Sequence, residues 1–190
     1  MPAPVNDLDT LPADLPVPAD DGGTDHLPGQ ALPPIALPAT DGRLINLAQL
    51  TGACVLFFYP RTGQPGQPPL VDNWNAIAGA RGCTPQTKGF RDHFAALTAR
   101  GVTVLGLSTQ SSDYQQELAG RLALPFPLLS DAALALTTAM ALPTFEAAGQ
   151  RLFKRMAWVV EGGTIVKVFY PVFPPDQNAS DVLNWLRARP

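Results

Sequence analysis

The strongest constraint on the fold is an unbroken apolar run at residues 53–59, Ala-Cys-Val-Leu-Phe-Phe-Tyr. A strand that is apolar on both faces belongs in a sheet that is covered on both sides. A second such run, residues 102–107, follows a segment with helical periodicity at residues 83–100. The order strand, helix, strand predicts parallel strands joined by a crossover helix.

The rest of the chain continues this alternation. Further helices are predicted over residues 111–122, 130–140 and 178–189, and further strands over residues 126–129, 153–160 and 164–169. Gly162-Gly163 marks a tight turn into the last strand, which adds an antiparallel pair. Residues 35–37 and 44–47 flank Asp41-Gly42 and indicate an N-terminal β-hairpin. We therefore predict an α/β fold with a mixed central sheet and helices on both faces.

The first 26 residues differ in composition from the rest. They carry six Asp and neither Lys nor Arg, and they alternate Pro, Ala and Leu without a period. Such a segment buries too little apolar surface to offset its ordering entropy, so we expect residues 1–26 to form a disordered acidic arm. We expect residues 27–190 to form one domain, because 190 residues leave little room for two.

Charge and composition exclude several classes of function. Outside the arm, 13 basic residues face 10 acidic ones, which is too weak a positive charge to predict nucleic-acid binding. No apolar run approaches the roughly 18 residues of a membrane span, and the N-terminus does not look like a signal peptide. With two Cys, two His and no CxxC pair, neither a zinc site nor a disulfide scaffold is expected. So few cysteines favour a reducing compartment, and we expect a cytoplasmic protein.

The candidate chemistry centres on Cys83, which stands at a predicted helix start. The free N–H groups and the dipole of a helix N-terminus favour a negative charge, so a thiol there loses its proton more easily. The thiolate is the reactive nucleophile. The alternative is an inert, buried Cys, and position alone does not separate the two. Residues 61–82 precede this Cys as a Gly- and Pro-rich loop with Trp74, which we expect to pack over the site.

The residues around this Cys resemble the peroxiredoxins, most closely the Q-type or bacterioferritin-comigratory group. The resemblance rests on Tyr59-Pro60 at a strand end, on Gly82-Cys83-Thr84-Pro85-Gln86 with Gly89-Phe90-Arg91-Asp92, and on Pro125-Phe126-Pro127-Leu128-Leu129-Ser130-Asp131. It covers about residues 27–186. It implies a thioredoxin-like fold and a thiol-dependent peroxidase that needs no metal or organic cofactor and reduces hydrogen peroxide or organic hydroperoxides through a cysteine sulfenic acid.

The resemblance also implies roles for particular residues. Cys83 corresponds to the peroxidatic Cys, and Arg155 to an Arg that stabilises the thiolate and the peroxide. Pro60 would shield the thiolate. It lies 23 residues before Cys83, however, where the family has seven, and position 80 is Ala where the family has Thr. Thr62 is therefore expected to fold back and supply the missing hydroxyl.

A second departure concerns turnover. Lys88 stands where many relatives have a resolving Cys. The other thiol, Cys54, lies about 20 Å away by strand geometry, whereas a disulfide needs Cα atoms within roughly 7 Å. We expect Cys54 to be a core residue, with a resolving role only if the helix start unwinds. An external thiol, such as thioredoxin, glutaredoxin or a small thiol, would then act as the reductant. A monomer is expected rather than a dimer.

Two other functions fit parts of the sequence. A thioredoxin-like thiol oxidoreductase would share the fold, but it lacks support because no second Cys stands at CxxC spacing. A non-catalytic thioredoxin-fold binding module is favoured by Ala80 and Lys88, where the family has catalytic residues. Rapid consumption of stoichiometric peroxide by the reduced protein would distinguish the enzyme from the module.

Overall fold

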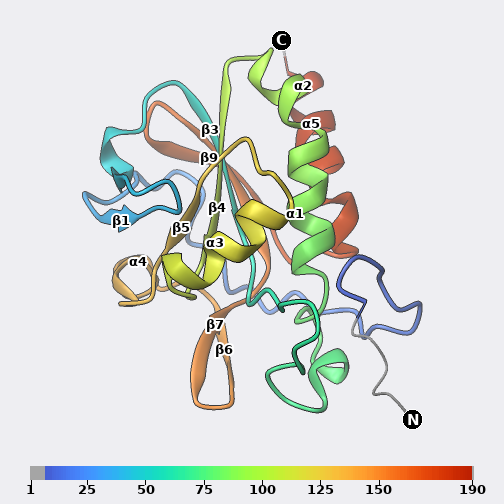
Figure 1. Cartoon of the computed structure of the whole chain (residues 1–190). Coiled ribbons are helices and arrows are strands. Elements are labelled where there is room, and N and C mark those ends of the chain that lie inside the picture. The colour runs from blue at the N-terminus through green and yellow to red at the C-terminus, as the bar shows by residue number, and fades with distance from the viewer. Residues whose placement is uncertain (1–6, 190) are drawn as a thin grey trace.

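The computed structural model describes residues 7–189, and its centre is a five-stranded sheet with the strand order β5-β4-β3-β8-β9 (Figure 1). The strands are β3 (Ala53–Phe58), β4 (Val102–Ser108), β5 (Leu128–Ser130), β8 (Met156–Glu161) and β9 (Thr164–Phe169). The predicted apolar run forms β3 in the middle of the sheet, parallel to β4 and antiparallel to β8. The predicted mixed sheet is therefore confirmed.

Helices cover both faces, as predicted. One face is packed by α1 (Cys83–Asp92), α2 (Phe94–Thr98), α3 (Ser112–Arg121) and α5 (Asn178–Arg187). The other face is covered by α4 (Ala135–Ala139) and the predicted N-terminal hairpin of β1 (Ala36–Pro38) and β2 (Leu44–Asn46). Side chains alternate between the two faces along β3. The core under α4 and the hairpin therefore receives Cys54, Leu56 and Phe58. The core under α1, α2, α3 and α5 receives Val55, Phe57 and Tyr59. This architecture is the thioredoxin-like α/β fold.

Some elements differ from the sequence prediction. The helix expected over residues 83–100 is divided at His93, whose ring contacts the Gly89 carbonyl at 2.8 Å. The helix expected from residue 130 begins later, since Asp131 accepts hydrogen bonds from the backbone N–H groups of Leu136 and Thr137. A hairpin of β6 (Thr144–Ala147) and β7 (Gln150–Phe153) was not predicted. Short 3₁₀ helices also occur in the described part of the chain, at Leu47–Gln49, Trp74–Ala76 and Pro175–Gln177.

The N-terminal segment differs from the expected disordered arm in the part that the structure describes. Residues 1–6 lie outside the described residues, but from residue 7 onward the chain lies against the domain. Leu8 and Thr24 are buried, and the Asp21 carboxylate bonds both Lys154 and the hydroxyl of Tyr170. The Lys154 hydrogen bond holds the pKa of Asp21 well below its usual range. Composition alone missed these contacts, because they join residues far apart in sequence.

Among the described residues, no helix has both the length and the apolar character needed to cross a bilayer.

Candidate active site

Cys83 is the first residue of α1 and is buried, with 4% of its surface exposed. Gly82 forms the N-cap, in a left-handed conformation with φ of 109°. A Cβ at this position would lie 2.6 Å from a Pro175 side-chain carbon, so the close approach requires glycine. The turn places the thiol at the positive end of the helix dipole.

Arg155 reaches this thiol from the segment between β7 and β8. Its side chain is 2% exposed, and Nη2 lies 3.4 Å from the Cys83 Sγ. The same Nη2 lies 3.1 Å from each of three backbone carbonyls in the loop before α1, those of Gly79, Ala80 and Arg81. One guanidinium therefore holds the end of the loop and contacts the sulfur.

Gln86 and Asn178 hold the guanidinium in place, and the sequence analysis assigned neither of them a role. Arg155 Nη1 donates to Gln86 Oε1 at 2.6 Å, and Gln86 Nε2 donates to Asn178 Oδ1 at 2.9 Å. All three side chains are buried. The available signal was that Gln86 lies about one helical turn after Cys83, on the same side of α1.

A small cavity opens beside the sulfur. Its volume is about 40 Å³, and its walls include Cys83, Thr62, Thr84, Trp74 and Leu8. A water molecule needs about 10–15 Å³ by this measure, so the space fits a few small atoms. The cavity thus matches the size of a peroxide group.

Thr62 forms part of the wall of this cavity, whereas Pro60 does not. Thr62 is buried, and its hydroxyl donates to Gln110 Oε1 at 3.1 Å. The amide of Gln110 donates back to the Thr62 carbonyl at 3.3 Å, which fixes the folded-back loop. Pro60 does not belong to the cavity wall, and its carbonyl accepts a hydrogen bond from Ser108 at 3.3 Å.

Cys54 lies on the opposite side of the sheet from Cys83. It packs in the core under α4 and the N-terminal hairpin, whereas Cys83 packs in the core under α1. Burial raises the pKa of the Cys54 thiol above its usual range. The structure therefore does not bring the two sulfurs together.

Tyr59 is buried in the same core as Cys83 and donates its hydroxyl hydrogen to Gln115 Oε1. Burial raises its pKa well above the usual range, and a negative charge on Cys83 raises it further. The phenol therefore stays protonated and neutral in the core that also holds Cys83. Among the described residues, no group of three or more His, Cys, Asp or Glu side chains is arranged to hold a metal ion.

The loop over residues 61–82 packs against the domain through Trp74. This side chain is buried, lies against the β6–β7 hairpin with its ring 6.2 Å from that of Phe145, and forms part of the cavity wall. The hairpin that the sequence analysis missed is thus the surface on which the loop rests.

We expect Trp74→Ala to loosen this loop, because removing a buried aromatic side chain leaves a void that typically costs 3–5 kcal/mol. Limited proteolysis should cut within residues 61–82 faster than in the parent, and Cys83 should react faster with a bulky maleimide. Leu44→Ala is the control, since Leu44 is exposed on the N-terminal hairpin. Unchanged cleavage and unchanged labelling would show that Trp74 does not anchor the loop.

The amino-acid sequence is similar to a known protein family and to several individual proteins that share one description. The sequence pattern of the Redoxin family matches residues 27–186. Peroxiredoxin bcp1 of Schizosaccharomyces pombe is 32% identical over 160 residues, which cover 82% of this chain and 72% of the relative. Peroxiredoxin Bcp of Escherichia coli is 28% identical over 168 residues, which cover 84% of this chain and 94% of the relative. A putative peroxiredoxin of Coxiella burnetii is 36% identical over 104 residues, 54% of this chain and 58% of the relative.

Solved structures share the fold. Peroxidoxin BcpB of Mycobacterium tuberculosis superposes with a TM-score of 0.68 at 24% identity, covering 87% of this chain and 99% of its own. The bacterioferritin comigratory protein of Xanthomonas campestris, whose structural report concerns alkyl peroxide reduction, superposes with a TM-score of 0.64 at 20% identity. That match covers 92% of this chain and 98% of the Xanthomonas protein.

Proposed function

Because the chain belongs to the Redoxin family and is a peroxiredoxin, a thiol-dependent peroxidase, we propose that Cys83 is the residue that attacks the hydroperoxide. The observation that carries the assignment is the Arg155 Nη2 at 3.4 Å from the Cys83 Sγ, beside a peroxide-sized cavity. A permanent planar cation and the N–H groups at the start of α1 both lie where they can stabilise negative charge during the reaction.

In the proposed reaction the Cys83 thiolate attacks the terminal oxygen of R–O–OH. The S–O bond forms as the O–O bond breaks, and the alkoxide takes up a proton and leaves as alcohol, or as water when the substrate is hydrogen peroxide. The sulfur becomes a sulfenic acid. Negative charge moves from sulfur to the leaving oxygen, and fixed donors in a water-poor site stabilise that charge without having to reorient.

The donors that we assign are the guanidinium of Arg155 and the first N–H groups of α1. Gln86 acts as a positioning residue, because it holds Arg155 Nη1 at 2.6 Å. The Thr62 hydroxyl donates its hydrogen bond to Gln110 Oε1. The lone pairs of the Thr62 oxygen therefore remain free to accept a hydrogen bond from the peroxide. Pro60 keeps the structural role of ending β3.

For turnover we propose a one-cysteine cycle. An external thiol attacks the sulfenic acid and releases water, and a second thiol then releases the mixed disulfide and restores Cys83. We assign Cys54 no part in this step, because it packs in the core on the other side of the sheet. The reductant would be thioredoxin, glutaredoxin or a small thiol, and the enzyme would work as a monomer in the cytoplasm. A thioredoxin-like dithiol exchange has no support. It needs a second thiol next to the first, whereas Cys54 is not at CxxC spacing and packs in a different core from Cys83.

The test is to mix the reduced protein with one equivalent of hydrogen peroxide and to measure the intact mass. We expect fast consumption of the peroxide and a gain of one oxygen on the peptide that contains Cys83. A small thiol added next should replace that oxygen with a mixed disulfide, whereas excess peroxide without thiol should give the sulfinic acid. A loss of two hydrogens with a peptide that links Cys54 to Cys83 would overturn the one-cysteine cycle.

A further inference from the structure

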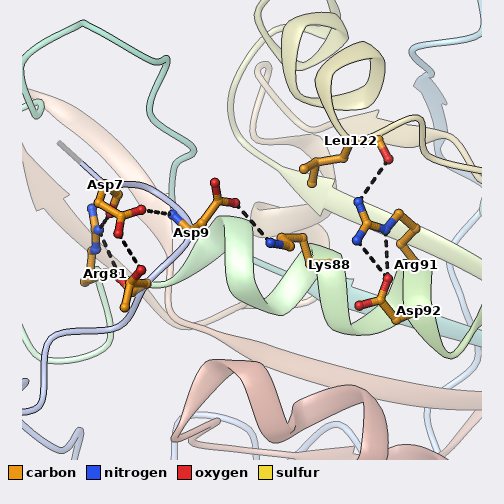
Figure 2. Close-up of polar contacts among 8 residues, drawn as sticks. Asp7, Asp9, Arg81, Lys88, Arg91, Asp92 and Leu122 are labelled. Carbon is orange, nitrogen blue, oxygen red and sulfur yellow. Dashed lines mark hydrogen bonds and ion pairs between the residues drawn. The ribbon is translucent and has the colours of Figure 1, made fainter. Parts of the chain in front are cut away.

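The acidic N-terminal segment does more than rest on the domain, because residues 7–11 close one side of the cavity at Cys83. Figure 2 shows this segment beside α1, with Asp7 next to Arg81 and with Asp9 next to Lys88. These contacts have no counterpart in the sequence analysis, which treated the segment as separate from the site.

Leu8 supplies the apolar part of the closure. It is 9% exposed and forms part of the wall of the cavity that Cys83 and Thr62 border. A Cβ built on Gly63 would lie 2.9 Å from a Leu8 methyl carbon, so the side chain sits directly on the loop. Leu11 approaches Gly82 equally closely, with 2.9 Å to a Cβ built there.

Polar contacts with both sides of the helix start hold the segment down. Arg81 Nη2 donates to the backbone carbonyls of Asp7 and of Thr10, the latter at 3.2 Å. Lys88 Nζ lies 3.3 Å from an Asp9 carboxylate oxygen. Arg81 precedes Cys83 in the chain and Lys88 follows it on α1. The segment is therefore held both by the loop before the thiol and by the helix after it.

One of these contacts, the Lys88–Asp9 pair, is electrostatic and therefore sensitive to salt. The Lys88–Asp9 pair is partly exposed to solvent, and salt weakens such pairs by screening. Asp7, Leu8 and Asp9 also border a groove on the same side of the molecule that carries the basic side chains of Arg91 and Arg121. The acidic segment thus lies beside basic side chains from both α1 and α3.

We propose that residues 7–11 form a clasp that sets the size of the hydroperoxide that reaches Cys83, with Leu8 as the specificity-determining side chain. This inference rests on the proposed function of Cys83. Hydrogen peroxide fits the closed cavity of about 40 Å³, whereas a bulky aryl hydroperoxide needs Leu8 to move away. The substrates admitted by the closed form are hydrogen peroxide and small alkyl hydroperoxides.

The test compares Leu8→Ala with the parent, using hydrogen peroxide and cumene hydroperoxide as substrates. The ratio of the second-order rate constants, cumene hydroperoxide over hydrogen peroxide, should rise about tenfold or more, the range that a change in an apolar pocket produces. Val17→Ala is the matched control, because Val17 lies in the same segment and is 68% exposed. A ratio that stays within about twofold of the parent would overturn the clasp.

A second measurement separates failure of the clasp from failure of the proposed peroxidase. Cys83 is alkylated with iodoacetamide and with a bulky dye-maleimide in a Cys54→Ser background, which requires no peroxide chemistry. Leu8→Ala should raise the maleimide rate relative to the iodoacetamide rate, as should Asp9→Asn, with the exposed Asp14→Asn as control. If the parent consumes no peroxide, the proposed function falls while this ratio still decides the clasp. An unchanged ratio in both variants overturns it.

Discussion

Replacing Cys83 by Ser will abolish peroxide reduction while the protein remains folded. A hydroxyl at this position is a far weaker nucleophile than a thiolate, and loss of a catalytic nucleophile has cost on the order of 10⁶ in kcat in a serine protease. Peroxide consumption by the variant should therefore equal that of buffer alone. Circular dichroism and the thermal midpoint should stay near the parent values, because Ser occupies slightly less space than Cys.

The control for this experiment is Cys54→Ser. Cys54 packs across the sheet from the site, so the variant should still consume one equivalent of peroxide and gain one oxygen at Cys83. Its stability should fall, since a hydroxyl takes the place of a buried thiol. Parent-like turnover in Cys83→Ser, or loss of the first oxidation in folded Cys54→Ser, would contradict the assignment of Cys83.

The second large effect is expected at Arg155. Arg155→Met keeps much of the apolar stem but removes the charge and the donor that lies 3.4 Å from the sulfur. Loss of one well-placed donor to a developing charge typically costs 10²–10³ in rate, about 2.7–4 kcal/mol. Stopped-flow measurement of the second-order rate constant with hydrogen peroxide should show a loss of that size.

Lys154→Met provides the matched control, since it removes the neighbouring positive charge, which pairs with Asp21 away from the sulfur. Its rate constant should stay near that of the parent. Arg155→Lys should fall between the parent and Arg155→Met, because Lys keeps the charge but cannot reach the sulfur and Gln86 at the same time. A parent-like rate constant for Arg155→Met would remove Arg155 from the reaction.

Local patterns in the sequence were enough to predict the central sheet and the helix start. The unbroken apolar run of β3 has no stable place except between two cores, and the turn before Cys83 marks a boundary that can be seen locally. The pairing of Arg155 with Cys83 could not be derived from such patterns. The two residues lie 72 positions apart, and only the resemblance to a family connected them.

The contacts missed by the sequence analysis are those between distant segments. Gln86 looks like an ordinary polar helix residue until Arg155 and Asn178 are found on either side of it. Leu8 looks like part of an acidic arm until the folded loop provides a surface for it. Composition averages over a segment, so it cannot show that a single Leu and two Asp have specific partners elsewhere.

The separation of the two cysteines by the sheet has a consequence for how the enzyme responds to its surroundings. In the proposed one-cysteine cycle no internal disulfide forms, so each oxidised molecule would wait for a collision with a reductant. The fraction of oxidised enzyme in a cell should therefore follow the ratio of peroxide supply to thiol supply. The fraction of molecules with oxidised Cys83 would then report the reducing capacity of the surroundings. An internal disulfide that completed the cycle would remove this dependence.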